Sequence, residues 1–241
     1  YSQNFGEFPK NEKEKLLIHQ SKLASMGEMI NNIAHQWRQP LTHLGFINMN
    51  LQLAFEDEPL DKKYLKEKIE ESNAQLDFMS KTIDNFRDFY KPNKQKEIFY
   101  ISVAVKKALE IMEPIFESNK IEFKFNVIKD KQINAYENEY SQVILNILTN
   151  AKDVLISRQI QNPKIIISIN EKNNSIITTI LDNAGGIENG YINHIFDPYF
   201  TTKQKGSGIG LYMSKMIIES HFKGKIKVFN KDKGASFSIE V

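Results

Sequence analysis

Among the histidines of this sequence, His35 has the surroundings that best suit a reactive side chain. It falls within a helical pattern of apolar residues, but its neighbours three and four positions away are all polar, namely Asn31, Asn32, Arg38 and Gln39. The imidazole is therefore expected on the solvated face of a helix, five residues before Pro40. A neutral imidazole has a lone pair that can attack phosphorus. A solvated surface histidine has the same pattern, so both interpretations stay open at this point.

Asn146 and Asn150 are four residues apart in a second helical pattern, which places both amides on one face. Asparagine is unfavourable inside a helix because its side chain competes for backbone hydrogen bonds. Two amide oxygens on one face are suitable ligands for a hard cation such as Mg²⁺. A polar surface pair is the alternative.

Asp182 ends an apolar strand pattern and is followed by Gly185 and Gly186. A carboxylate beside a backbone that permits close approach can accept a hydrogen bond from the exocyclic amine of adenine. Taken alone, the same residues would also suit an ordinary turn.

Two loop motifs follow. Phe196 and Phe200 flank a proline and can close over a ligand, with Lys203 reaching a phosphate, although simple packing of the loop would explain them too. The glycine-rich run 206–211 then opens a helix, and backbone N–H groups at a helix N-terminus bind phosphate. The run fits neither the dinucleotide-binding nor the Walker pattern.

The elements that must position these residues fall into two halves. Up to about Tyr90, apolar residues recur every three or four positions, which predicts two long helices joined by a turn at 56–59. Each helix has only one apolar stripe, so we expect two copies of the hairpin to form a four-helix bundle. Pro40 predicts a kink in the first helix.

Residues 91–97 are polar and predict a linker, after which the pattern alternates between strands and helices. The expected helices cover about 102–118, 138–159 and 208–221, and the expected strands are Phe123–Val127, Ile165–Ile169, Ile176–Leu181, Ile226–Val228 and Ala235–Val241. This order, with a hairpin at its end, predicts an α/β sandwich.

Composition narrows the class of protein. The net charge of +2 gives no indication of a nucleic-acid partner, and the absence of cysteine excludes disulfides and thiolate metal sites. No apolar run approaches the ~18 residues that span a bilayer, so we expect no membrane contact by this chain. Because it begins with Tyr1, we expect a fragment of a longer protein, with residues 1–19 as a helical lead-in from a missing upstream region.

In combination, the motifs resemble the nucleotide-binding boxes of the Bergerat-fold (GHKL) ATPases. The resemblance rests on Asn146…Asn150, Asp182-Asn-Ala-Gly-Gly, Phe196…Phe200, Gly206-Ser-Gly-Ile-Gly-Leu211 and Gly234-Ala-Ser236-Phe. The run Ala34-His35-Gln-Trp-Arg-Gln-Pro40-Leu41 resembles the H box of histidine kinases. The chain is thus similar to a two-component sensor histidine kinase of α+β class, with a dimerisation and phosphotransfer domain over 20–91 and a catalytic domain over 92–241.

The resemblance implies an ATP-dependent protein-histidine kinase that phosphorylates His35 and passes the phosphoryl group to an aspartate in the receiver domain of a response regulator. It implies a homodimer through residues 20–90, in the cytoplasmic portion of a protein that is expected to be anchored in the inner membrane. The implied ATP-binding residues are Asn146, Asn150, Asp182, Gly186, Phe196, Phe200, Lys203, Gly206, Gly208, Gly210, Leu211 and Ser236, of which Asn146 and Asn150 also position Mg²⁺.

The sequence departs from many relatives beside His35. Gln36 stands where they have an acidic residue, and a glutamine accepts no proton at neutral pH. Gln39 stands where they have Thr or Asn for dephosphorylating the regulator, and it can still orient a water. Two alternatives to the histidine kinase remain open. One is an ATP-driven conformational clamp of the same superfamily, and the other is a dimerisation module with a degenerate nucleotide site.

Overall fold

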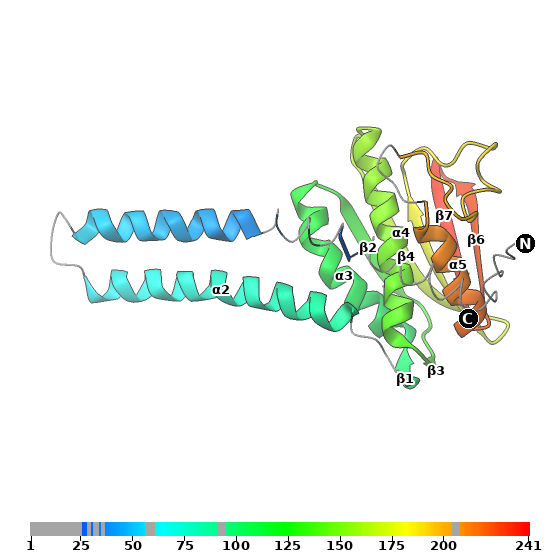
Figure 1. Ribbon diagram of the computed structural model, residues 1–241, viewed down its shortest axis with the longest axis horizontal. Helices are drawn as coiled ribbons and strands as arrows, with labels where there is room; N and C mark the ends of the chain where they lie inside the picture. The colour runs from blue at the N-terminus through cyan, green and yellow to red at the C-terminus, as the bar shows by residue number, and fades with distance from the viewer. Residues whose placement is uncertain are drawn as a thin grey trace, which may run out of the picture. The chain divides into compact units, whose positions relative to one another are not determined.

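The computed structural model describes residues 26–27, 30, 34, 37–55, 61–90, 95–203 and 208–241 (Figure 1). The chain divides into two compact units, one comprising residues 28–91 and the other including residues 92–241. Several predictions lie outside the described residues, namely the lead-in 1–19, the turn at 56–59, and His35, Gln36 and Gly206.

The unit of residues 28–91 is built from two helices, as predicted. Residues 37–55 are helical throughout, so the chain stays helical across Pro40, and α2 runs over Lys62–Tyr90. A polar contact joins the two helices, since His43 Nε2 lies 2.6 Å from Glu71 Oε1. Lys68 Nζ donates to the other carboxylate oxygen at 2.7 Å, and these two partners, Lys68 first, lower the pKa of Glu71.

The unit of residues 92–241 is a sheet covered by helices. Its five strands have the order β2 (Glu122–Val127), β4 (Lys164–Lys172), β5 (Ser175–Asp182), β7 (Gly234–Glu240) and β6 (Lys225–Lys231). β2 is parallel to β4 and the other neighbours are antiparallel. The helices α3 (Ile101–Ser118), α4 (Glu137–Ser157) and α5 (Gly210–His221) form the second layer, in which α4 contacts both of the others (Figure 1). The predicted α/β sandwich and its final hairpin are confirmed.

The hydrophobic core lies between these two layers. Ile165, Ile167 and Ile169 alternate along β4 and are fully buried, as a strand with one covered face requires. On α3 and α4 the buried residues recur every three or four positions. One polar pair crosses the core, where Tyr140 donates its hydroxyl hydrogen to Thr178 Oγ1 at 2.8 Å. The core therefore fixes α4, which carries Asn146 and Asn150, against β5, which carries Asp182.

Two short strands were not predicted. β1 (Glu97–Tyr100) pairs antiparallel with β3 (Gln132–Ala135), so the interpretation of Glu97 as linker was wrong. Four-residue strands are too short to show a clear alternation. The predicted helices also ended or began inaccurately: α4 stops at Ser157 because Gln159 has a φ of +49°, and α5 starts at Gly210 instead of 208.

Candidate active site

Asp182 is the last residue of β5 and is almost fully buried, with 7% of its surface exposed. Its Oδ1 atom accepts the N–H groups of Ala184 at 2.8 Å and Ala235 at 3.1 Å. Both donors therefore bind the same oxygen, and Oδ2 keeps its capacity to accept from a ligand. A buried carboxylate with one oxygen to spare suits recognition of an amine.

Burial raises the pKa of the Asp182 carboxyl above its ordinary value. The N–H groups of Ala184 and Ala235 act in the opposite direction because they favour the ionised form, and the charge of Arg158 adds to their effect. The folded chain thus holds a carboxylate in a place where its charge is costly. A binding partner that donates to it would offset part of that cost.

The turn after Asp182 is held by two side chains from other elements. Arg158, at the end of α4, donates from Nη1 to the carbonyls of Ala184 at 2.6 Å and Gly186 at 2.8 Å. The Asn230 amide on β6 both accepts from and donates to the backbone of Ile187, each at 2.7 Å. The hydrogen bond from Arg158 to its carbonyl therefore holds Gly186 in position after Asp182.

β7 approaches Asp182 closely at Gly234. A Cβ at this position would collide with the Asp182 carbonyl oxygen, so no residue with a side chain fits while β7 keeps this register. The approach brings Ser236 beside Leu181, its partner in the β5–β7 ladder. Ser236 Oγ is buried and finds no hydrogen-bond partner within the described part of the chain. Cross-strand partners share a face and successive residues alternate, so this hydroxyl lies on the sheet face opposite to the Asp182 carboxylate. The register therefore does not bring the predicted nucleotide contact of Ser236 together with Asp182.

Asn146 connects α4 to the beginning of α5. Its Nδ2 donates to Ser214 Oγ at 2.8 Å, and that hydroxyl donates to the Gly210 carbonyl. A Cβ on Gly210 would lie 2.5 Å from Asn146 Oδ1, so the glycine allows the two helices to meet here. The amide nitrogen of Asn146 thus has a structural hydrogen bond to Ser214, whereas its oxygen lies beside Gly210 at the N-terminus of α5.

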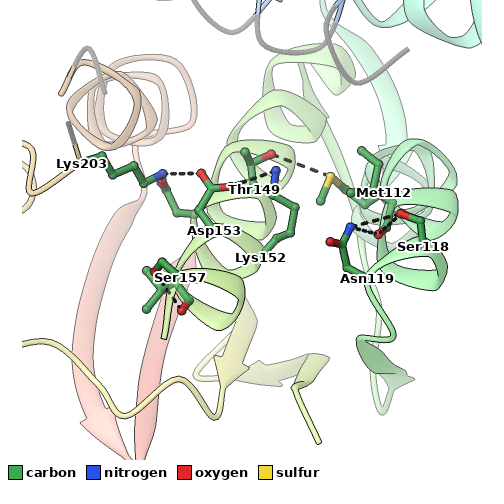
Figure 2. Close-up of polar contacts among 11 residues, drawn as sticks. Met112, Ser118, Asn119, Thr149, Lys152, Asp153, Ser157 and Lys203 are labelled. Atoms are coloured by element: carbon green, nitrogen blue, oxygen red, sulfur yellow. Dashed lines mark hydrogen bonds and ion pairs between the residues drawn. The ribbon is translucent and has the colours of Figure 1, made fainter. Parts of the chain in front are cut away.

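Asn150 lies one turn further along α4 and contacts the loop that carries Lys203. The Lys203 ammonium donates to Asn150 Oδ1 at 2.8 Å and lies 2.6 Å from Asp153 Oδ2. Figure 2 shows Lys203 reaching towards Asp153, whose second oxygen is 2.9 Å from the Nζ atom of the buried Lys152. Asn150, one of the two predicted Mg²⁺ ligands, therefore already has a cationic partner.

The two predicted phenylalanines belong to separate clusters. Phe196 packs edge-on against Phe237 of β7 with ring centroids 6.5 Å apart, and the Lys215 ammonium lies 5.9 Å from its ring centroid. Phe200 packs instead against Tyr191 at 5.7 Å. Phe196 thus faces the strand that carries Ser236, whereas the contacts of Phe200 lie within its own loop.

The remaining predicted residues gather at the start of α5. Gly208 has a φ of +65° and lies against the backbone of Tyr199, and Gly210 and Leu211 form the first turn of α5. No acidic residue occupies that first turn, so no side-chain carboxylate within it opposes the binding of an anion such as phosphate.

Within the described ranges, no three His, Cys, Asp or Glu side chains cluster as a metal site. A divalent cation near α4 would therefore depend on amide oxygens and on oxygens supplied by the nucleotide, which is a common arrangement for Mg²⁺. In the same part of the chain, no helix has the length and apolar character to cross a membrane.

Sequence reasoning missed the residues that brace the site, which are Arg158, Ser214 and Asn230. Each binds a partner between about 26 and 68 positions away along the chain. Such contacts leave no local motif. The one available signal was the scarcity of arginine, because Arg158 is one of only three arginines in the sequence.

The comparisons with known proteins agree on one family. Residues 135–241 match the model described as histidine kinase-, DNA gyrase B-, and HSP90-like ATPase. The chain is 27% identical to the two-component sensor PprA of Pseudomonas aeruginosa over 97% of its own length and 26% of that protein. It is 29% identical to the signal transduction histidine-protein kinase AtoS of Escherichia coli over 95% of its length and 37% of AtoS. The chain thus spans between about a quarter and two fifths of these relatives.

Solved structures support the same fold. The catalytic domain of histidine kinase ThkA is 26% identical with a TM-score of 0.55, and the match covers 61% of this chain and 95% of that domain. The structure of ThkA in complex with the response regulator TrrA aligns with 99% of this chain and 67% of that one, at 23% identity and a TM-score of 0.52, which supports the fold alone. The Bergerat-type fold predicted for the second half is thereby confirmed.

We predict that Asp182→Asn makes the nucleotide-free chain at least as stable as wild type at neutral pH. The asparagine can still accept from Ala184 and Ala235, but it has no charge to bury. The folded-state pKa of Asp182 is raised, so burying its charge lowers the stability of the folded chain. This loss is absent below the ordinary aspartate pKa, where the carboxyl is protonated in both states, and it grows as the pH rises through the folded-state pKa. Calorimetric melting temperatures at pH 4 and pH 7 test this. A wild type that is clearly more stable than the variant at pH 7 would contradict it.

Proposed function

Because this chain belongs to the two-component sensor histidine kinases, we propose that it transfers the γ-phosphate of ATP to His35 and then to an aspartate of a response regulator. The observation that carries the proposal is the buried Asp182 carboxylate, whose Oδ1 accepts two backbone N–H groups while Oδ2 remains available to a ligand. Asp182 lies within residues 135–241, which match the ATPase family model.

In the proposed complex, the chain's own groups divide the nucleotide between them. Asp182 accepts from the adenine amine. The oxygens of Asn146 and Asn150 face the phosphate end, where they would hold Mg²⁺, and the first turn of α5 offers its N–H groups. When bound, Mg²⁺ would neutralise phosphate charge. Such transfers depend on positioning and charge neutralisation.

His35 is the proposed nucleophile because of its chemistry and its place in the sequence. A neutral imidazole can attack phosphorus with the lone pair of one nitrogen, while the other nitrogen keeps its proton until that proton is oriented or removed. Gln36 cannot take that proton, so we propose that it orients the ring through a hydrogen bond and that water takes the proton. Gln39 is exposed on its helix, which is compatible with a role in orienting water when the regulator is dephosphorylated.

Exposed apolar residues support a homodimer through residues 20–90. Leu65, Ile69, Leu76 and Ile83 recur every four or seven positions on α2, and each has between 37% and 52% of its surface exposed. Positions with this spacing share one helix face. A second copy of the hairpin would cover this stripe in a four-helix bundle.

A second apolar face supports docking of the receiver domain. Phe46, Met49 and Leu53 are each more than half exposed, and they follow Thr42 at intervals of three or four residues. The same rhythm continues backwards through the sequence to Gln39 and His35. A receiver domain seated on this face would bring its aspartate to the phosphorylated histidine, so we assign the face to that partner.

The first prediction for this function concerns His35 itself. Incubation of the wild type with γ-labelled ATP and Mg²⁺ should yield acid-labile, alkali-stable phosphoprotein, and His35→Gln should yield none because the nucleophile is gone. Asn150→Ala, which removes an oxygen proposed for Mg²⁺, is the matched variant: it should also prevent labelling while leaving the dimer intact. Label that persists in His35→Gln would favour the ATP-driven clamp instead.

The dimer is tested by placing charge in its proposed interface. The double variant Ile69→Glu/Leu76→Glu should shift the mass measured by light scattering from dimer to monomer, because buried unpaired carboxylates are costly. Ala74→Glu is the control, since Ala74 is exposed and about 140° around α2 from Ile69. A double variant that stays dimeric, or a wild type that is monomeric at micromolar concentration, would refute the assignment.

The receiver-docking face makes a separate prediction. Phe46→Asp should retain autophosphorylation but transfer its label at least about tenfold more slowly to a receiver domain that wild type labels, because interface aromatic residues often contribute more than 1 kcal/mol. Phe55→Asp is the control: Phe55 is 75% exposed and about 180° around the helix from Phe46. Equal transfer rates from both variants would show that the receiver docks elsewhere.

A further inference from the structure

The contacts of Lys203 place a positive charge on a proposed metal ligand. Its ammonium donates to Asn150 Oδ1 at 2.8 Å and to Asp153 Oδ2 at 2.6 Å. One cation thus reaches both oxygens, which come from consecutive turns of the same face of α4. Figure 2 shows Lys203 approaching this face from its own loop.

The anchor of Lys203 is itself fixed in place. Asp153 Oδ1 pairs with Lys152 Nζ at 2.9 Å, and only 9% of the Lys152 side chain is exposed, against 38% of the Lys203 side chain. The carboxylate is therefore held by a buried partner on one side and presents its other oxygen to Lys203. An ammonium between an amide oxygen and a fixed carboxylate has the ligand set of a small cation site.

We propose that Lys203 takes the place of the divalent cation at Asn150 whenever no metal is bound. This inference rests on the proposed function and adds to it a second role for Lys203. An ammonium and Mg²⁺ compete for the same oxygen, because two cations held a few Å apart at one atom repel each other. Binding of the metal at Asn150 therefore displaces Lys203 from that oxygen.

The two states differ in what neutralises the nucleotide. Without metal, Lys203 remains at Asn150 and supplies the positive charge beside the phosphates. With metal, Mg²⁺ supplies it and Lys203 contributes less. Lys203 therefore strengthens nucleotide binding more in the absence of Mg²⁺ than in its presence. By linkage, it weakens the binding of Mg²⁺ to the nucleotide complex by the same factor. A lysine that only touched phosphate in the final complex would affect both forms of binding alike.

The test is the affinity of the full chain for a non-hydrolysable ATP analogue, measured by calorimetry in EDTA and in saturating Mg²⁺. The readout is the dissociation constant measured in EDTA divided by the dissociation constant measured in saturating Mg²⁺. Lys203→Gln should raise this ratio on the order of tenfold relative to wild type, a typical size for coupling between sites. The affinity of Mg²⁺ for the free analogue is common to all variants and cancels in the comparison.

Two further variants serve as controls. Lys203→Arg keeps the charge and should keep the ratio close to wild type. Lys129→Gln removes a lysine from an exposed ion pair with Glu171 and should change nothing. If Lys203→Gln weakens binding equally in both conditions, or not at all, the inference is overturned while the proposed function stands. If wild type binds the analogue in neither condition, both are overturned.

Discussion

The candidate site depends on the burial of one negative charge. Asp182 closes β5 at a point where burial opposes its ionisation, and the surrounding structure offsets that cost with two backbone N–H groups and the nearby Arg158. Those donors are in place because Gly234 lets β7 approach and because Arg158 and Asn230 fix the turn after the strand. Three elements distant in sequence thus fix a single buried carboxylate, an arrangement that is typical of functional sites.

The same logic extends to the opposite end of the site. Asn146 and Asn150 lie half-buried on one face of α4, and each amide already has a partner, Ser214 for one and Lys203 for the other. A polar group in a packed layer needs such partners when no ligand is present. These contacts use the same side chains that we propose for the nucleotide complex, so structure and proposed function share them.

Much of this architecture could be predicted from the sequence, because periodicity reports which face of an element is covered. The three helices of the second unit and its longer strands follow from that signal, and so does the position of Asp182 at a strand end. β1 and β3 were missed because four residues hold too little pattern. The contacts of Arg158 and Lys203 were missed for another reason: they join residues 26 to 53 positions apart, and only the folded chain brings such residues together.

The central claim is that Asp182 recognises the exocyclic amine of adenine. The most direct measurement compares the affinity of the full chain for ATP with its affinity for purine riboside triphosphate, which lacks only that amine. A buried carboxylate left without its donor should make the second ligand bind at least about tenfold more weakly, since hydrogen bonds to charged groups contribute about 1.5–3 kcal/mol. Equal affinities would contradict the account, because Asp182 would then be buried for a reason other than the nucleotide.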